Sequence, residues 1–423
     1  MAYTLISMIG TGMYKTSKDF EGYVETDYYF TGKHFKTRLF IQAILQMQYK
    51  PINQIILLGT DTSSWDCLVD KDNDEKDETI ELWDSLFDQC EKQTDDKKLP
   101  NGVSKENLDR LEKYLSERFK LDVVIKCHSP NIDKTTSEEL FNCYTEVTDI
   151  VKKDNDILFD ITHGFRSMPV LLYQSLQYSL SQKNRKVEII YGELDINDKS
   201  KGYARDLSSY WSYSELAVAL NVFKSKLDGF KLAELIEPYW KQGSKAIKRL
   251  SEIVQTNFAF QIVEVHRQIK NALDKFPLDT SNWLNPIKTL LKEICDLVDE
   301  KSMSKTLFKY SQFLYSHNLN VQSIITLQIT VEATIIEKYA NSTYFGDYDW
   351  WNEYGKGLLK NLKEKHWKEI HKPLNDLEYF RNQIAHGGGR NKDGDFPHAA
   401  NIPGVYESGK KGVEKLFEIL KKE

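Results

Sequence analysis

The stretch DILFDITHGFRSMP, residues 156–169, decides the fold of the first half of this chain. Its first seven residues form an apolar run that predicts a buried β-strand, and the residues after Pro169 have the pattern of a helix that lasts to about Ser181. A short turn that contains His163 and Gly164 joins the two. A strand that leads through such a turn into a helix is the repeating unit of a parallel α/β sheet.

Similar units lie on either side of this stretch. Apolar runs at 2–9, 53–58, 122–126 and 186–192 predict further strands, and helical patterns occupy 35–48, 79–92, 104–119 and 136–152. Residues 21–31 read as a hairpin or an extended arm. Because the strand cores are continuously apolar, we expect a Rossmann-like parallel sheet that is covered on both faces.

Three loops should lie at the carboxyl ends of these strands, where α/β sheets bind ligands. They span residues 10–14, 59–64 and 162–167, and they are rich in Gly, Thr and Ser. Backbone N–H groups in such loops suit phosphates. The pattern Gly-x-Gly-x-x-Gly of dinucleotide-binding folds is absent from the first loop. An ordinary strand-to-helix turn, with Arg166 paired to a nearby acid, is the alternative for the third loop.

The second half of the chain has helical patterns at 207–229, 230–275, 286–300, 304–316 and 321–339, and a final helix from residue 410. We expect loops at 341–357 and 387–408, and a break near 277–286. The apolar stripes of the helices between 207 and 275 predict core or dimer contacts. The fold class is therefore α/β followed by all-α.

The helix predicted at residues 374–386 has two chemically different faces. Leu374, Leu377, Phe380 and Ile384 recur at helical spacing and should be buried, whereas Asn382 and His386 lie one turn apart with Arg381 beside them. Histidine can move a proton near neutral pH, and arginine can stabilise charge on a phosphate. This set suits RNA cleavage without a metal ion. A histidine in the last turn of a helix is also simply a favourable partner for the helix dipole.

Composition narrows the class of protein. The net charge is −6, but residues 201–423 hold 32 Lys and Arg against 28 Asp and Glu, a balance of +4 that is compatible with RNA binding. Five scattered cysteines predict neither a disulfide framework nor a metal site. The absence of a long apolar run and of a signal peptide predicts a cytoplasmic protein that does not span a membrane.

Several motifs together resemble one family. DITHGFRSMP at 160–169 is similar to the hallmark of CRISPR-associated proteins that carry an N-terminal CARF domain, a Rossmann-like sensor of cyclic oligoadenylate. The opening ISMIGTG at 6–12 and LGT at 58–60 resemble the first two loops of that domain. Arg381 and His386 resemble the Arg-x(4–6)-His motif of HEPN ribonucleases. Residues 70–100 match no motif of the family.

The resemblance implies a CARF domain at 1–205, a helical linker at 206–300 and a HEPN ribonuclease domain at 301–423. It implies a homodimer or a higher oligomer that binds cyclic oligoadenylate, which we expect to be cyclic tetra-adenylate, and then cuts single-stranded RNA to leave a 2′,3′-cyclic phosphate. The expected catalytic residues are Arg381, Asn382 and His386, and no metal or cofactor is expected. The expected activator contacts are Gly10, Thr11, Gly12, Thr60, Thr62, His163, Gly164, Phe165 and Arg166.

Two alternatives remain open. The chain could be a nucleotide-sensing regulator without catalytic activity, against which the intact Arg381, Asn382 and His386 speak. It could also be a ring nuclease that degrades the cyclic oligoadenylate in its sensor domain, with His163 or the threonines as reactive groups. A nicotinamide enzyme is a more distant alternative, because the glycine fingerprint is missing.

Overall fold

The computed structural model of the chain describes residues 2–10, 23–71, 74, 76–90, 102–128, 136–164, 167–180, 185–198, 200–277, 282–299, 301–385 and 401–422. Contacts divide the chain into two compact units, Met1–Tyr213 and Ser214–Glu423, and each unit is described by itself. The domain boundaries predicted after residues 205 and 300 stay predictions.

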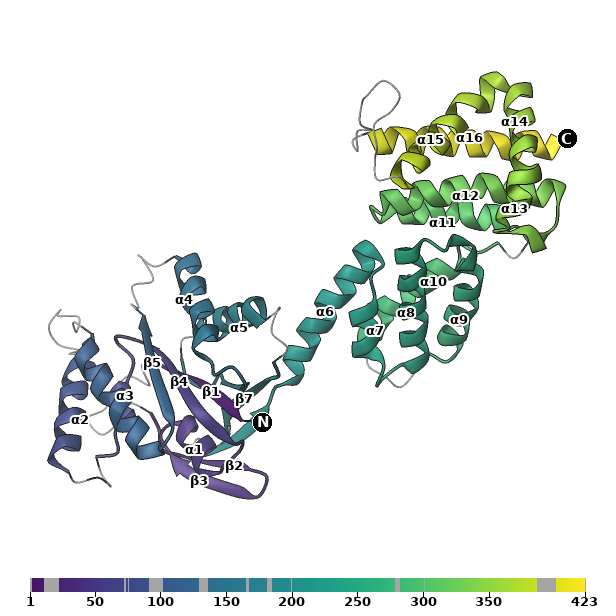
Figure 1. The fold of residues 1–423 in the computed structure, drawn as a ribbon. Coiled ribbons are helices and arrows are strands. Elements are labelled where there is room, and N and C mark those ends of the chain that lie inside the picture. Colours follow the sequence, from purple (N-terminus) through teal and green to yellow (C-terminus); the bar gives the residue numbers. More distant parts are fainter. Residues whose placement is uncertain are drawn as a thin grey trace. The chain divides into compact units, whose positions relative to one another are not determined.

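A mixed β-sheet forms the centre of the first unit (Figure 1). In the described part of the chain its strand order is β3-β2-β8-β7-β6-β1-β4-β5. The strands are β1 (Tyr3–Ile9), β2 (Thr26–Phe30), β3 (Lys33–Thr37), β4 (Ile52–Thr60), β5 (Asp122–His128), β6 (Asp156–Asp160), β7 (Val187–Leu194) and β8 (Lys201–Asp206). From β7 to β5 every pairing is parallel, which confirms the predicted Rossmann-like sheet.

Helices cover both faces of this sheet, as the continuous apolar runs predict. Leu5 and Ile9 of β1 pack into a core with α1 (Phe40–Gln46), α2 (Asp77–Cys90) and α3 (Lys105–Phe119). Ile6 and Met8 point to the other face, into a core with α4 (Ser137–Ile150) and α5 (Ser167–Leu180). Alternate residues of one strand thus serve two cores, so polar residues have no place along it unless they are hydrogen-bonded.

Three strands beyond β7 depart from the prediction. β8 pairs antiparallel to β7, β2 pairs parallel to β8, and β3 pairs antiparallel to β2. The sequence predicted no strand at β8 and one helix over 35–48. In the structure the helix begins only at Phe40, because β3 continues to Thr37 and the Thr37 hydroxyl accepts the backbone N–H of Leu39 (3.2 Å).

The second unit is helical and contains two apolar cores. One is built by the end of α6 (Ser209–Lys226) with α7 (Phe230–Ile236), α8 (Lys241–Thr256), α9 (Ile262–Asp274), α10 (Asn285–Cys295) and α11 (Met303–Ser316). The other joins α12 (Asn320–Tyr339), α14 (Lys356–Lys365), α15 (Lys372–Ala385) and α16 (Ile402–Lys422). α12 contributes Ala333 to the first core and Leu327 to the second, so it links them.

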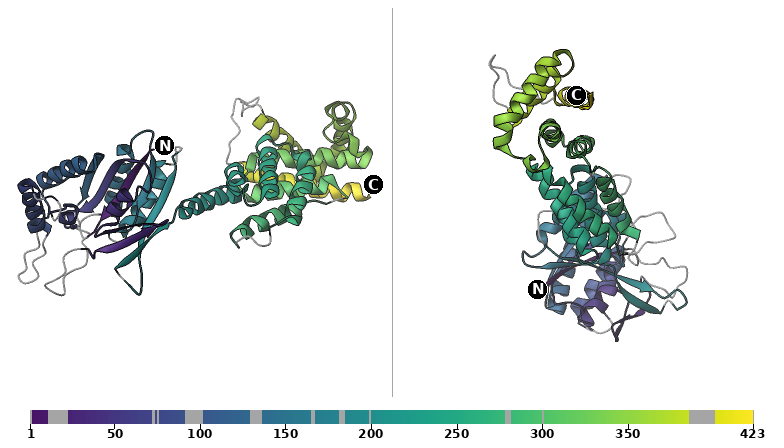
Figure 2. Two further views of the ribbon diagram at one scale, coloured as in Figure 1. Left: turned by 90° about the horizontal axis from the view of Figure 1, so that it is seen from below. Right: turned by 90° about the vertical axis from the view of Figure 1, so that its right-hand side faces the viewer.

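Two predicted loops of this unit contain helical residues. Within 341–357 the structure has α13 (Tyr348–Trp350) and a π-helical turn, Trp351–Gly355, and a second π-helical turn, Trp367–His371, precedes α15. α16 begins at Ile402, so residues 402–408 are helix and not loop. The right-hand view of Figure 2 looks nearly along α16. The rest of the predicted loop at 387–408, up to residue 400, lies outside the described residues.

Within the residues that the structure describes, no helix has the length and apolarity that crossing a membrane requires.

Candidate functional site

The loops after β1, β4 and β6 meet at the carboxyl edge of the sheet, as predicted. The backbone N–H of Ser64 donates to the carbonyl of Gly10 (2.9 Å), and the Ser63 hydroxyl donates to the carbonyl of Ile9 (2.7 Å). These bonds attach the loop after β4 to the end of β1. The β6 loop reaches the same place, because a Cβ added to Gly10 would lie 3.0 Å from the backbone nitrogen of Gly164.

Gly10 and Gly164 allow this close approach. Gly164 has a φ of +124°, a conformation that residues with a side chain rarely adopt. A Cβ at Gly164 would also lie 3.1 Å from Cβ of Met8. The two glycines are therefore required by the packing of the loops themselves, whatever ligand the loops bind.

Hydroxyl groups organise the loop after β4. Oγ of Ser63 accepts the backbone N–H of Thr60 (2.8 Å) and lies 3.2 Å from Oγ1 of Thr60. Oγ1 of Thr60 in turn lies 3.2 Å from Oγ1 of Thr62, and Nε1 of Trp65 donates to the Thr60 carbonyl (2.8 Å). Thr60 is buried, whereas Thr62 is only half-buried. Of the two predicted contacts, Thr62 is the one whose hydroxyl can reach a ligand, with Thr60 behind it.

Asp61 lies between these threonines and was not predicted as a site residue. Its Oδ1 is buried and has no hydrogen-bond partner among the described residues. Burial raises the pKa of the carboxyl group, against hydrogen bonds from the backbone of Thr62 and of Asp61 itself. Gly102, at a φ of +80°, lies directly against this side chain, where a Cβ would approach Cβ of Asp61 to 2.7 Å. No sequence motif marks this contact, because the two residues are 41 positions apart.

The imidazole of His163 caps a helix. Its Nε2 accepts the backbone N–H of Phe40, the first residue of α1, over 3.1 Å. The first N–H groups of a helix have no partner within it, so His163 satisfies one of them from across the chain. Because this bond uses the lone pair of Nε2, the neutral ring bears its proton on Nδ1. Burial lowers the pKa of His163 to about 4, so the ring is neutral at pH 7.

Tyr23 completes this corner, although the sequence analysis did not single it out. Its hydroxyl accepts the backbone N–H of Gly10 (2.8 Å). Its ring packs edge-on against His163, with 4.5 Å between the ring centroids. The β1 loop and the β6 loop are thereby joined through one aromatic side chain.

Asp160 and Thr162 anchor the β6 loop to the sheet. Oδ2 of the fully buried Asp160 accepts the Ser7 hydroxyl (2.7 Å), and Oδ1 accepts the backbone N–H of Thr162 (2.9 Å). Burial is the main influence on the Asp160 carboxyl and raises its pKa. Oγ1 of Thr162 accepts the backbone N–H of Gly192 on β7 (2.7 Å). Asp160 is buried and Thr162 is half-buried, and through these bonds both residues hold the loop in place.

Of the predicted activator contacts, the structure brings together Gly10, Thr60, Thr62, His163 and Gly164. Thr11, Gly12, Phe165 and Arg166 lie outside the described residues.

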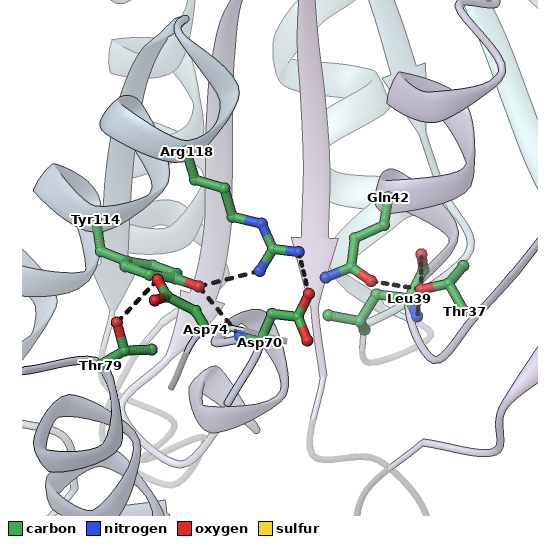
Figure 3. A network of polar contacts seen from close by, with 8 residues as sticks. All are labelled: Thr37, Leu39, Gln42, Asp70, Asp74, Thr79, Tyr114 and Arg118. Atoms are coloured by element: carbon green, nitrogen blue, oxygen red, sulfur yellow. Dashed lines mark hydrogen bonds and ion pairs between the residues drawn. The ribbon is translucent and has the colours of Figure 1, made fainter. Parts of the chain in front are cut away.

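A second polar network of this unit contains none of the predicted site residues (Figure 3). Arg118 of α3 forms an ion pair with Asp70 and donates to the Tyr114 hydroxyl (3.0 Å), which also accepts the backbone N–H of Asp70 (3.2 Å). Thr37 and Gln42 lie nearby, on the rim of a cavity of about 200 Å³. The network ties α3 to the segment that follows β4, so we assign it a structural role.

In the second unit, α15 has the two faces that its sequence predicts. Leu374, Leu377 and Phe380 are buried against α12 and α16. Arg381 and Asn382 are half-buried, and Nη1 of Arg381 donates to Oδ1 of Asn382 (2.9 Å). The amide therefore holds the guanidinium directly, although adjacent residues of a helix point about 100° apart. His386 lies outside the described residues.

Glu332 of α12 belongs to the same region and was missed by the sequence analysis. Burial raises the pKa of its carboxyl group, and the positive charge of Arg381 acts in the opposite direction. Glu378, one turn before Arg381 on α15, raises the pKa of Glu332 further. The negative charge of Glu332 and the positive charge of Arg381 therefore attract each other.

In the part of the chain that the structure describes, no group of three or more His, Cys, Asp or Glu is arranged to hold a metal ion.

The sequence of the first unit matches that of a known protein family. Residues 4–195 match the family described as "CRISPR system endoribonuclease Csx1, CARF domain". Most strands of the sheet and the described residues of the three loops at its carboxyl edge fall within this match to a CARF domain, as the motifs predicted. This match ends before the helical unit, so the HEPN assignment stays a prediction.

Two further proteins are similar to the chain over most of its length. It is 24% identical over 429 residues to "CRISPR-associated protein MJ1674" of Methanocaldococcus jannaschii, which covers 94% of this chain. The chain spans 64% of the length of that relative. A solved structure of Enterococcus italicus Csm6, bound to cyclic hexa-2′-fluoro-hexa-dAMP, aligns at 12% identity and a TM-score of 0.38 over 99% of this chain and 95% of that one. A likeness at that TM-score supports no argument.

Proposed function

We propose that this chain is a CRISPR-associated effector whose CARF domain binds a cyclic oligoadenylate and whose helical unit cuts single-stranded RNA. The observation that carries the assignment of a sensor domain is the CARF family match over residues 4–195. The meeting of the three loops at the carboxyl edge of the sheet agrees with it. The nuclease rests on the Arg381, Asn382 and His386 motif at the end of α15.

Phosphates of the activator would lie against backbone N–H groups of the three loops. Thr62, whose hydroxyl is half-buried, and Arg166 are the side chains that we assign to direct contact, with Gly10, Thr11, Gly12, Gly164 and Phe165 around them. Thr60 and His163 support the site from behind, because Thr60 is buried and Nε2 of His163 accepts the backbone N–H of Phe40. A cyclic oligoadenylate has rotational symmetry, which suits a site formed at the two-fold axis of a homodimer.

Exposed apolar residues support a dimer. On α6, Ala219 and Phe223 are buried, whereas Val218 and Val222, one turn apart on another face, are 63% and 42% exposed. On α5 of the CARF domain, Val170 is 60% exposed. We assign the exposed pair Val218 and Val222 on α6 to the contact with a second copy.

The proposed cleavage uses the 2′-OH of the RNA as nucleophile. A bond forms between O2′ and phosphorus while the bond from phosphorus to O5′ breaks, so the products are a 2′,3′-cyclic phosphate and a 5′-OH. The proton of the 2′-OH must leave and O5′ must gain one. We assign His386 to one of these proton transfers and the Arg381 guanidinium to the charge on the phosphate. Asn382, whose amide oxygen accepts from Arg381, orients the guanidinium.

The test is a cleavage assay with end-labelled single-stranded RNA and a panel of cyclic tri-, tetra- and hexa-adenylate, with EDTA present. We expect cleavage that depends on cyclic tetra-adenylate and fragments that end in a 2′,3′-cyclic phosphate. Binding of an activator with no cleavage of any RNA would favour the non-catalytic regulator. Cleavage that EDTA abolishes would contradict the proposed chemistry.

The structure gives little support to His163 as the base of a ring nuclease. Its Nε2 lone pair already accepts the N–H of Phe40, and its lowered pKa makes it a weak base. An Arg381→Ala/His386→Ala variant, incubated with cyclic tetra-adenylate, separates the two activities. We expect the activator to stay intact in that variant.

A further inference from the structure

A cleft on the second unit lies on the surface of α14, the π-helical turn before α15, and α15 itself. It encloses about 340 Å³. Its walls combine positive, aromatic and amide side chains, and none of them belongs to the predicted catalytic set. The lining residues are Trp351, Lys356, Leu359, Lys360, Lys363, Glu364, Trp367, His371, Asn375 and Glu378.

The segment that forms most of this cleft is positively charged, whereas the chain as a whole is negatively charged. Residues 356–372 contain six lysines and two glutamates, a balance of +4 in a chain of net charge −6. Lys363 is buried, and its Nζ is paired with Oε2 of Glu378 at 2.9 Å. Lys356 and Lys360 are exposed, and Nζ of Lys360 lies 4.0 Å from Oε1 of Glu364. Two cations at the cleft are thus accessible to an anion.

The aromatic wall of the cleft has one supported face and one open face. The ring of Trp367 stacks on His371, with centroids 3.3 Å apart and planes at 28°. The His371 ring is held from below by Asn375, whose Nδ2 lies 3.1 Å from Nε2. Trp367 is nevertheless 59% exposed. A flat ring fixed on one side and open on the other is a platform on which a nucleobase can stack.

The cleft shares a helix face with the catalytic motif. His371 precedes α15 by one residue, and Asn375, Glu378 and Asn382 follow it at intervals of four, three and four. At 100° per residue these four lie within about 60° of arc on one side of the helix. From Asn375 to Asn382 the rise is about 10 Å. A strand that passes along this face from the cleft therefore arrives at Asn382, the hydrogen-bond partner of Arg381.

We propose that this cleft is a substrate subsite that binds one nucleotide of single-stranded RNA beside the cleavage position. The base stacks on the open face of Trp367, and Lys356 and Lys360 contact the flanking phosphates. Lysines interleaved with an exposed aromatic ring are the usual means of binding single strands without sequence preference. The inference rests on the proposed function only for the position of the cleft relative to the cut, not for RNA binding itself.

The first test measures binding without cleavage. Anisotropy of a fluorescent 2′-O-methyl oligoribonucleotide, which lacks the attacking 2′-OH, gives the Kd for the full chain and its variants. Trp367→Ala should raise the Kd about tenfold, since stacking on a protein aromatic is worth about 1–3 kcal/mol per base. Trp367→Phe, which keeps a flat ring, should recover most of that loss. Tyr239→Ala removes an aromatic of equal exposure (57%) outside the cleft and should leave the Kd unchanged.

The second test measures the charge contribution. Lys356→Ala/Lys360→Ala should reduce the slope of log K against log salt concentration by about 1.4, because each phosphate that a lysine neutralises on a single strand adds about 0.7 to that slope. Lys245→Ala/Lys248→Ala, on the exposed face of α8, is the matched control and should leave the slope unchanged. Circular dichroism of each variant shows that it folds.

The outcomes separate the subsite from the proposed nuclease. If the wild-type chain cuts RNA while Trp367→Ala and Lys356→Ala/Lys360→Ala keep its KM and Kd, the subsite is wrong and the nuclease stands. If these variants lose binding of the 2′-O-methyl strand and the wild type never cuts RNA, the cleft binds RNA but the nuclease is wrong. A change in oligomeric state in Trp367→Ala, with unchanged Kd, would make the cleft an interface between copies and overturn the proposal.

Discussion

The edge of the CARF sheet and the end of α15 are both candidate sites, but they are built in opposite ways. At the sheet edge, residues from three loops and from β7 meet through a set of hydrogen bonds that includes Ser64 to Gly10, Phe40 to His163 and Gly192 to Thr162. At the end of α15, neighbours in sequence make the contact, as Arg381 and Asn382 do. Side chains at the sheet edge mainly bond to distant parts of the chain, whereas Arg381 and Asn382, which we propose for catalysis, bond to each other. Substitutions at the sheet edge should therefore mainly reduce stability, whereas substitutions on α15 should mainly reduce activity.

The largest effect should come from α15. Arg381→Ala/His386→Ala should reduce RNA cleavage at least about 100-fold, because general acid–base catalysis alone contributes 10²–10⁴-fold. Binding of cyclic tetra-adenylate, followed by isothermal titration calorimetry, should not change. Cleavage at the wild-type rate in the double variant would show that α15 is not the catalytic helix.

At the sheet edge, His163 should make folding depend on pH. Its pKa is lowered from an ordinary 6.5 to about 4, so the unfolded chain binds a proton between these values and the folded chain does not. Stability is thus fully present above about pH 6.5 and falls as the pH drops toward about 4, by at most about 3 kcal/mol.

Urea denaturation at a series of pH values checks this, with His163→Gln as the comparison. Glutamine does not titrate, and its amide oxygen can still accept the N–H of Phe40. A loss of stability on acidification that is equal in the two proteins would remove His163 as the cause.

Gly164 should be the next most sensitive position. Gly164→Ala introduces a side chain at a φ of +124° and a Cβ 3.1 Å from that of Met8, so we expect a loss of about 2 kcal/mol. Thermal unfolding measures the loss, and activator binding should weaken with it because the loops can no longer meet. Gly32→Ala is the control, since Gly32 also has a positive φ but no atom within 4 Å of the added Cβ. Equal losses would mean that backbone strain alone matters.

The smallest of these effects should come from Ser63. Ser63→Ala removes a buried hydroxyl that accepts from Thr60 and donates to Ile9, and should cost about 1–2 kcal/mol. The Kd of the Ser63→Ala variant for the activator should be compared with the Kd of the Thr62→Ala variant. We expect Thr62→Ala to weaken activator binding with little loss of stability. The reverse ranking would show that the hydroxyl of Thr62 does not contact the ligand.

The sequence predicted those strands whose hydrophobic pattern matches their burial in the folded chain. β1, β4, β6 and β7 are apolar runs because both faces of the sheet are covered. β8 was missed because it lies outside the parallel strands, and its Lys201 and Arg205 are exposed and polar. Its backbone hydrogen bonds come from β7 and β2, which a single segment cannot reveal.

The start of α16 was missed for another reason. Gly404 makes the segment before residue 409 resemble a loop, whereas Gly409 and Gly412, which follow it, allow close packing of helices. A Cβ at Gly412 would lie 2.8 Å from Cβ of Pro373, and one at Gly409 would lie 3.2 Å from Leu377. The glycines bring α16 onto α15, the helix that bears the proposed catalytic residues.

For the candidate site, the sequence indicated which residues lie at the sheet edge. It did not indicate what each of these side chains binds. The Gly, Thr and His positions at the sheet edge were predicted from loops that follow strands, and those that the structure describes do lie together. That His163 caps α1, that Tyr23 binds Gly10, and that Asp61 is buried beside Gly102 depend on contacts between distant parts of the chain. No motif contains this information.

The central claim is that an activator bound to the CARF domain switches on cleavage at α15. The most direct measurement titrates cyclic tetra-adenylate into the wild-type chain and follows both the rate of RNA cleavage and the binding of the activator. We predict a negligible rate without activator and a half-maximal rate at a concentration equal to the Kd, with binding retained and cleavage lost in Arg381→Ala/His386→Ala. A rate that is the same at every activator concentration would contradict it.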